Sequence, residues 1–176
     1  MNYALIAVLI VFSAFFSGSE IAYASVNELR LKRAAEDGKN RLASLAWKIY
    51  EKYDDALITI LIGNNLVNIA ASSVATVIAI TLLGDDGAWA ATGIMTVLII
   101  TFGEIIPKIV AVQTAFGFTK LAAVPLWILM IVTFPIVWLM QKLLHCIDRL
   151  WSDKSDAAKP AITEEDLETI IDTVED

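Results

Sequence analysis

The stretch ALITILIGNNLVNIAASSVATVIAITLLG, residues Ala56–Gly84, decides the fold class, because it runs for 29 residues without a charged side chain. About 20 apolar residues are enough to cross the hydrocarbon core of a bilayer as a helix. Two other segments are similar: Met1–Asn27 carries a single charge, Glu20, and Leu121–Gln141 carries none. A soluble core would rarely contain several such runs. The sequence therefore predicts an all-α membrane protein.

Composition supports this class. Hydrophobic residues make up 57% of the 176 residues and the mean hydropathy is +0.67, whereas soluble domains are about 45–50% apolar. The net charge of −7 comes from residues 153–176, which hold nine acids and two lysines. No basic patch suggests nucleic-acid binding.

The single cysteine, Cys146, adjoins the single histidine, His145, and this pair favours packing over a metal site. We expect no enzyme activity, because no nucleophile–base pair or cofactor loop is present.

The distribution of basic residues predicts the orientation. The loop Glu28–Asp55 contains seven Lys and Arg, whereas the turn Gly84–Gly87 contains two acids and no base. Cytoplasmic loops of membrane proteins carry an excess of Lys and Arg. We therefore expect the N-terminus outside the cell and the basic loop in the cytoplasm. Three transmembrane helices are predicted, over about residues 3–26, 56–83 and 88–112.

Within the basic loop, residues 27–53 show apolar residues at helical spacing on either side of Gly38. Two amphipathic helices at the membrane surface would fit this pattern, and so would helices packed on a soluble partner domain. The C-terminal part, residues 151–176, reads as a linker followed by the acidic amphipathic helix TEEDLETIID.

The fourth apolar run is ambiguous. Basic residues precede and follow it, so both ends are expected in the cytoplasm, and Pro125 and Pro135 lie inside it. Proline removes an amide donor and bends or breaks a helix. These features favour a re-entrant or juxtamembrane hairpin over about residues 121–147. The alternative is an ordinary kinked fourth span, which would place the acidic tail outside.

Each predicted span carries a polar cluster that hydropathy alone does not require. The clusters are Ser13, Ser17, Ser19 and Glu20 in the first span, Asn64, Asn65 and Asn68 in the second, and Gly103, Glu104 and Lys108 in the third. A rise of about 1.5 Å per residue places all three at one level, near or just inside the bilayer centre. Any one cluster could serve helix packing alone. Two intramembrane carboxylates, however, indicate a functional site.

The chemistry of these groups points to a hard cation. Hydroxyls, amide carbonyls and carboxylates are oxygen donors, which suit Mg²⁺, Ca²⁺ or alkali ions rather than zinc, copper or iron. Pro107 has no amide, so the Gly103 carbonyl loses its helical donor and becomes available to line a cavity. Lys108 could pair with Glu104 or with Glu20 when no cation is bound.

The motifs SGSEIA, GNNLVN and GEIIPK occur in this order, one in each predicted span. They resemble the DUF21 transmembrane domain of the CorC/CNNM family of magnesium and cobalt efflux proteins, over residues 1–150. The resemblance implies a homodimer with three spans per subunit in the plasma or inner membrane, and Mg²⁺ leaving the cell in exchange for Na⁺. By motif position the cation site would be lined by Ser17, Ser19, Asn64, Asn68, Gly103 and Glu104, shaped by Pro107 and supported by Glu20, Asn65 and Lys108.

Family members usually continue into a paired CBS module, which is absent from these 176 residues. We therefore expect the chain to be a piece of a longer protein whose CBS pair is its intramolecular partner. The sequence predicts a Na⁺-coupled Mg²⁺ exporter. A Mg²⁺-sensing regulator of another transporter is the alternative, and a structural membrane anchor ranks third. Oxygen ligands do not distinguish Mg²⁺ from Co²⁺.

Overall fold

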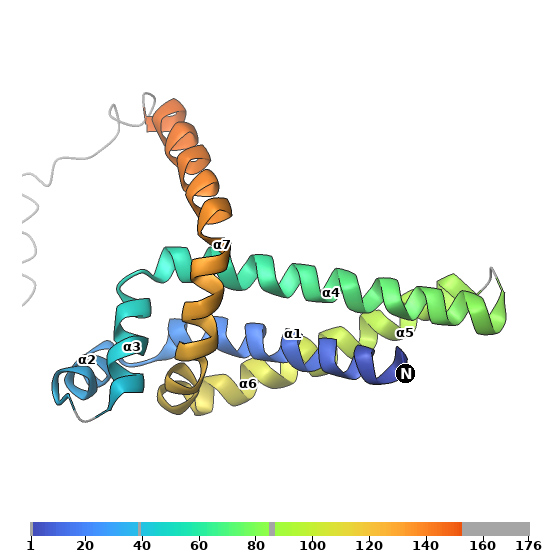
Figure 1. Ribbon diagram of the computed structural model, residues 1–176, viewed down its shortest axis with the longest axis horizontal. Coiled ribbons are helices and arrows are strands. Elements are labelled where there is room, and N and C mark those ends of the chain that lie inside the picture. The colour runs from blue at the N-terminus through green and yellow to red at the C-terminus, as the bar shows by residue number, and fades with distance from the viewer. Residues whose placement is uncertain (1, 39, 85–86, 153–176) are drawn as a thin grey trace, which may run out of the picture. The chain divides into compact units, whose positions relative to one another are not determined.

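The computed structural model describes residues 2–38, 40–84 and 87–152 (Figure 1). All regular elements in these ranges are helical, as predicted. The helices are α1 (Asn2–Ser25), α2 (Glu28–Glu36), α3 (Arg41–Tyr50), α4 (Tyr53–Leu83), α5 (Gly87–Leu98), the π-helix η1 (Ile99–Ile105), α6 (Ile106–Gln113) and α7 (Ala115–Ser152). The predicted acidic helix lies outside the described residues. The chain divides into two compact units, residues 1–137 and 138–176, and the first of these units contains the polar clusters of all three predicted spans.

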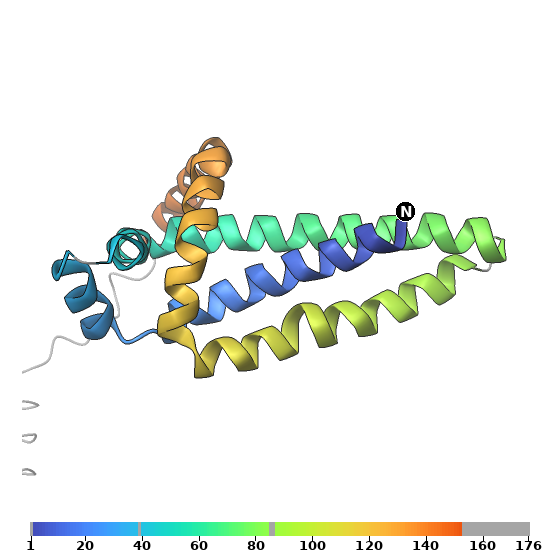
Figure 2. The same cartoon turned by 60° about the horizontal axis from the view of Figure 1, so that its bottom comes forward.

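Three long helical segments run side by side: α1, α4 and the continuous segment α5–η1–α6 (Figures 1 and 2). Each is long and apolar enough to cross a membrane, over Tyr3–Ser25, Tyr53–Leu83 and Gly87–Gln113. These are the positions where the sequence predicted spans. Gly84, which ends α4, has a φ of 75°, a conformation that glycine adopts without steric cost. Glycine at this position therefore allows the chain to turn after α4.

The predicted hairpin over residues 121–147 is wrong. Residues 115–152 form one continuous helix that contains both Pro125 and Pro135. Each proline removes one amide donor and bends the helix, but the remaining hydrogen bonds continue it, so the chain does not reverse. Ala115–Leu144 is thus a fourth helix of sufficient length and hydropathy, where three were predicted. Up to residue 137, α7 runs across α1 and α4 instead of alongside them (Figures 1 and 2).

The two short helices of the basic loop occupy the positions that the sequence indicated. Asn27 caps α2 by accepting a hydrogen bond from the Arg30 amide, and Asn40 caps α3 in the same way. Such caps satisfy amides that have no partner inside the helix. Gly38, between the helices, has a φ of 65°, which glycine tolerates. The buried faces of α2 and α3 pack against the ends of the long helices next to the basic loop.

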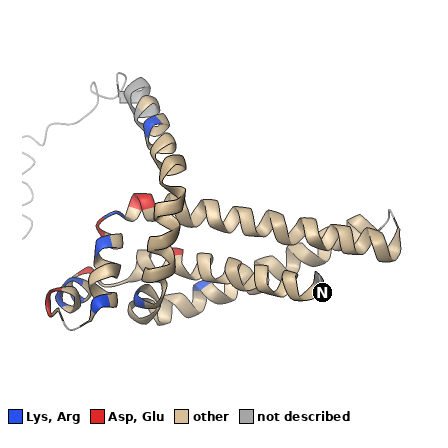
Figure 3. Ribbon diagram, in the orientation of Figure 1, with Lys and Arg blue, Asp and Glu red and all other residues tan. Residues whose placement is uncertain are grey.

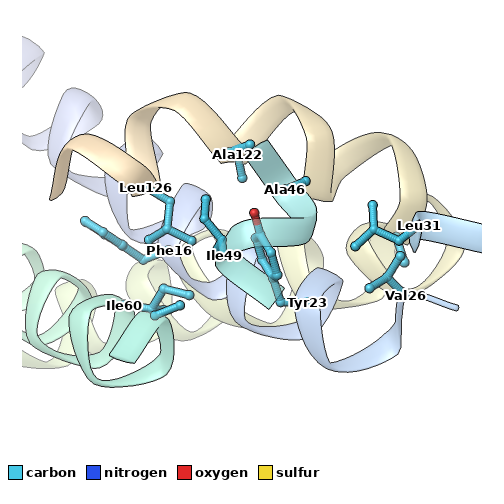
Figure 4. Close-up of a cluster of buried hydrophobic side chains, with 12 residues drawn as sticks. Phe16, Tyr23, Val26, Leu31, Ala46, Ile49, Ile60, Ala122 and Leu126 are labelled. Carbon is cyan, nitrogen blue, oxygen red and sulfur yellow. The ribbon is translucent and has the colours of Figure 1, made fainter. Parts of the chain in front are cut away.

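A hydrophobic cluster joins α1, α2, α3, α4 and α7 (Figure 4). Tyr23 lies at its centre, fully buried, and its hydroxyl donates to the Thr119 carbonyl of α7 at 3.3 Å. Phe16 of α1 lies so close to Gly63 of α4 that a Cβ there would overlap the ring. Small residues let membrane helices approach closely, and packing contacts then stabilise them. This cluster holds α1 and α4 together directly beside the polar residues of α1.

Candidate functional site

Polar groups of the three long segments meet at Ser13. Its hydroxyl is fully buried, donates to Asn64 Oδ1 at 3.0 Å, and lies 3.5 Å from the Gly103 carbonyl oxygen. One side chain of α1 therefore contacts both α4 and η1. The sequence placed Ser13 in the polar cluster of the first span, four residues before Ser17 and on the same helical face, but not among the predicted cation ligands.

The π-helix explains how the third segment presents its backbone. Ile106 donates to the Thr101 carbonyl, a bond across five residues, and Pro107 supplies no amide to Gly103. A Cβ added at Gly103 would lie 2.7 Å from Ser13 Oγ, so glycine is required for this approach. Single π-turns within α-helices occur frequently at functional sites. The sequence predicted a freed Gly103 carbonyl but not the π-turn that accompanies it.

Asn68 and Glu104 form a second contact between α4 and η1. Asn68 Nδ2 donates to Glu104 Oε1 over 3.5 Å, which is long for a hydrogen bond. Asn68 Oδ1 is buried without a hydrogen-bond partner in the described structure, and so is Ser17 Oγ. A buried polar atom left unpaired costs about 1–3 kcal/mol. These two oxygens are therefore available to a bound ion or water.

The two unpaired oxygens approach the Ser13–Asn64 contact from opposite sides. Because α1 and α4 run in opposite directions (Figure 1), Ser17 follows Ser13 toward one end of the bundle and Asn68 follows Asn64 toward the other. Side chains in a helix lean toward its N-terminus. Ser17 and Asn68 thus both lean back toward the Ser13–Asn64 contact.

The two carboxylates have different partners. Lys108 Nζ of α6 lies 3.2 Å from Glu20 Oε2 of α1. The sequence left Glu104 and Glu20 open as partners of Lys108, and the structure selects Glu20. Glu104 contacts Asn68 instead. The site therefore contains one carboxylate paired with a cation and one carboxylate next to an amide.

Two predicted residues lie at the margin of the site. Ser19 is buried, but its hydroxyl donates to the Phe15 carbonyl of its own helix at 2.7 Å. Asn65 is exposed and forms no hydrogen bond with the described site residues. The structure brings Asn64 and Gly103 together at Ser13 and Asn68 together with Glu104. Ser17 is buried four residues from Ser13 on the same helix, and Pro107 follows the π-turn.

The donor set consists of oxygen atoms alone. Among the described residues, no group of three or more His, Cys, Asp or Glu could hold a metal ion. Softer transition metals prefer nitrogen and sulfur ligands, whereas Mg²⁺ and Ca²⁺ accept hydroxyl, carbonyl and carboxylate oxygens. The arrangement of Ser, Asn, Glu and the Gly103 carbonyl thus fits a hard cation.

Residues 4–175 match the model of the CNNM family, the cyclin M transmembrane N-terminal domain. The chain belongs to this family. The three motifs thus predicted the family correctly, and the long apolar helices of this CNNM domain make it a multi-pass membrane domain.

Relatives in bacteria and animals are similar over most of the CNNM domain. A UPF0053 protein of Haemophilus influenzae is 40% identical over 167 residues, covering 95% of this chain and 40% of the relative. The inner membrane protein YfjD of Escherichia coli is 38% identical over 164 residues, covering 90% and 37%. The metal transporter cnnm-1 of Caenorhabditis elegans is 31% identical over 154 residues, covering 84% and 18%. The chain spans about two fifths of the length of these bacterial relatives.

Proposed function

We propose that this CNNM domain forms the ion pathway of a secondary transporter that exports Mg²⁺ in exchange for Na⁺. The observation that carries the proposal is the pair of buried, unpartnered oxygens, Ser17 Oγ and Asn68 Oδ1, beside the Ser13–Asn64–Gly103 contact in three apolar segments. Polar groups at this depth are costly and mark ion pathways. The name of the Caenorhabditis elegans relative, a metal transporter, supports the same class.

In this mechanism the chain replaces part of the hydration shell of the transported ion. Mg²⁺ keeps several waters and takes few protein ligands at about 2.0–2.1 Å. The hydroxyl of Ser17 and the amide oxygens of Asn64 and Asn68 would supply neutral ligands, and the Gly103 carbonyl a backbone ligand. Glu104 would offset charge. Broken helices in transporters use freed carbonyls for cations in the same way.

Orientation and assembly are part of the proposal. Lys and Arg gather at the end of the bundle where α2, α3 and the start of α7 lie (Figure 3), so this end faces the cytoplasm of a plasma or inner membrane. The N-terminus is then outside and the C-terminus inside. We further propose a homodimer, with a CBS pair in the full-length protein as the cytoplasmic partner.

Ion titration and transport by the purified chain test the proposal. Glu104→Gln is expected to weaken Mg²⁺ binding by about tenfold or more, because a contact with a charged group is worth about 1.5–3 kcal/mol. Asn68→Ala should weaken it as well. Asn65→Ala is the matched control, since it removes an amide from the exposed face of the same helix. Unchanged Mg²⁺ titration and transport in both site variants would refute the proposal.

Proteoliposomes separate a transporter from a Mg²⁺ sensor. Vesicles loaded with Mg²⁺ should lose it when an inward Na⁺ gradient is applied, and the loss should depend on Glu104. Vesicles that retain Mg²⁺ although the protein binds it would identify a sensor that regulates another transporter. Repeating the measurement with Co²⁺ determines whether the site selects between the two ions.

A further inference from the structure

A second polar pocket lies away from the cation site, where α1 meets α2 and α6 meets α7. Its volume is about 410 Å³, and it is lined by Ser25, Asn27 and Arg30 on one side and by Gln113, Thr114 and Phe116 on the other. No acidic residue lines it. It shares no residue with the predicted cation site, so its chemistry requires a separate explanation.

Two cations contact one aromatic ring that lines this pocket, and one of them, Arg30, lines the pocket as well. The Arg30 guanidinium and the Lys120 ammonium each lie 4.3 Å from the centroid of Phe116. They are therefore within twice that distance of each other, and like charges at such a separation repel. Within the described residues neither cation forms an ion pair. Contact with the ring holds both cations in place, and an anion beside them would relieve the repulsion.

The position of the pocket indicates which kind of anion would fit it. Ser25 ends the first apolar segment and Gln113 ends the third, so the pocket lies where two helices leave the hydrocarbon, at the level of the lipid headgroups. Apolar side chains adjoin the cations: Leu29 is 63% exposed, Leu121 is 71% exposed, and Val112, which lines the pocket, is 57% exposed. A lipid satisfies both features, because its phosphate meets the cations and its acyl chains meet the apolar residues.

We propose that this pocket binds the headgroup of an anionic phospholipid from the leaflet at the basic end of the bundle. Lys and Arg near a membrane surface attract anionic lipids, and Figure 3 shows these residues gathered at that end. Arg30 and Lys120 contact the phosphate, and Phe116 positions both of them. The bound lipid joins the start of α2 to the start of α7 and steadies the corner between α6 and α7.

The test compares phosphatidylglycerol with phosphatidylcholine carrying the same chains. Each lipid is titrated into the purified chain in detergent, and thermal unfolding is followed by tryptophan fluorescence. Phosphatidylglycerol should stabilise the wild type at a lower concentration. Arg30→Gln/Lys120→Gln should weaken this binding about 30-fold, since each surface cation contributes about fivefold. Phe116→Leu keeps the charge and should weaken it by at least about threefold.

The matched control removes two charges elsewhere in the basic loop. Arg41→Gln/Lys48→Gln alters exposed residues of α3 that do not line the pocket, and it should retain the preference for phosphatidylglycerol. Three results would overturn the proposal: no preference in the wild type, an equal loss in this control, or unchanged binding by Phe116→Leu. Inorganic phosphate is titrated in a separate arm. Stabilisation by phosphate equal to that by phosphatidylglycerol would also overturn it, because the ligand would then be a free anion.

Discussion

Replacing Gly103 with alanine is expected to disturb the point where the three long segments meet. The new Cβ would lie 2.7 Å from Ser13 Oγ and 3.2 Å from Ser13 Cβ, both shorter than ordinary contacts. The Ser13 hydroxyl must rotate, which gives up its hydrogen bond to Asn64, or α1 must shift. Over-packing of this kind costs typically about 1–3 kcal/mol, and an interhelical hydrogen bond in a membrane accounts for about 0.6 kcal/mol of such a loss.

The helix preference of alanine offsets part of this cost. Alanine stabilises a helix by about 0.5–1 kcal/mol relative to glycine, so the free energy of unfolding of Gly103→Ala should fall by about 0.5–2 kcal/mol. Gly93→Ala is the matched control, because a Cβ at Gly93 in α5 meets nothing within 4 Å and should give the helix gain alone. The two variants should therefore differ by the over-packing cost, about 1–3 kcal/mol.

Reversible unfolding in mixed detergent micelles measures this difference. A double variant, Ser13→Ala/Gly103→Ala, removes Ser13 Oγ and leaves only the 3.2 Å contact to its Cβ. The two substitutions should therefore couple by about 1 kcal/mol. If Gly103→Ala is as stable as Gly93→Ala and the double variant shows no coupling, Ser13 and Gly103 do not approach each other as described.

Two further substitutions test contacts between helices. Lys108→Met leaves the Glu20 carboxylate without the partner that lies 3.2 Å away, and should lower the free energy of unfolding by about 1–3 kcal/mol. Adding Glu20→Gln should restore most of this stability, and a double variant that stays as unstable as the single one would contradict the pairing. Thr59→Val removes the 2.9 Å hydrogen bond to Thr133 of α7, worth about 0.6–1.7 kcal/mol in a membrane. Thr92→Val is its control, because the Thr92 hydroxyl bonds only to its own helix. Equal losses of unfolding free energy in the two variants would show that the hydrogen bond to α7 adds no stability.

The three long segments could be predicted because hydrocarbon thickness fixes their length. A membrane helix needs about 20 apolar residues, and charged or glycine-containing turns end each run. The residues 56–83 predicted for the second span lie within α4, which begins three residues earlier, at Tyr53. Asp54 and Asp55 stand in its first turn, where the positive end of the helix dipole favours acids. The two acids therefore marked where the apolar run begins, but the helix begins before them.

The course of α7 depends on tertiary contacts that charge patterns do not show. Reversing a chain within a membrane requires residues that can form a turn, yet no glycine or asparagine occurs between residues 118 and 144. This absence is a signal against a hairpin, whereas the prediction rested on the basic residues at both ends of the run and on the two prolines. The path of α7 is set instead by Ala122, Ala123 and Leu126, which pack against α1, α3 and α4. These three residues have helical spacing both in a hairpin of two helices and in one continuous helix, so their spacing does not distinguish the two.

For the site, depth along each helix was predictable, but rotation about each helix axis was not. Counting residues brought the clusters of the three segments to one level, and the contacts of Asn64 and Asn68 with the other two segments agree with this. Which side chain faces which neighbour depends on the rotation of each helix, and a π-turn changes that rotation locally by adding a residue to the turn. Ser13 therefore occupies the centre, whereas Ser19 and Asn65 lie at the margin.

Under the proposed function, the pairing of Lys108 decides how much negative charge the site presents. While Lys108 binds Glu20, Glu104 is the carboxylate that contacts a predicted ligand, Asn68. One carboxylate balances a monovalent cation but leaves a divalent cation with an excess positive charge in a low-dielectric environment, where that excess is costly. Release of Lys108 from Glu20 would present a second carboxylate and favour the divalent ion. The same ion pair thus couples the charge of the bound cation to the contact between α1 and α6, which is what an exchanger of Mg²⁺ for Na⁺ requires.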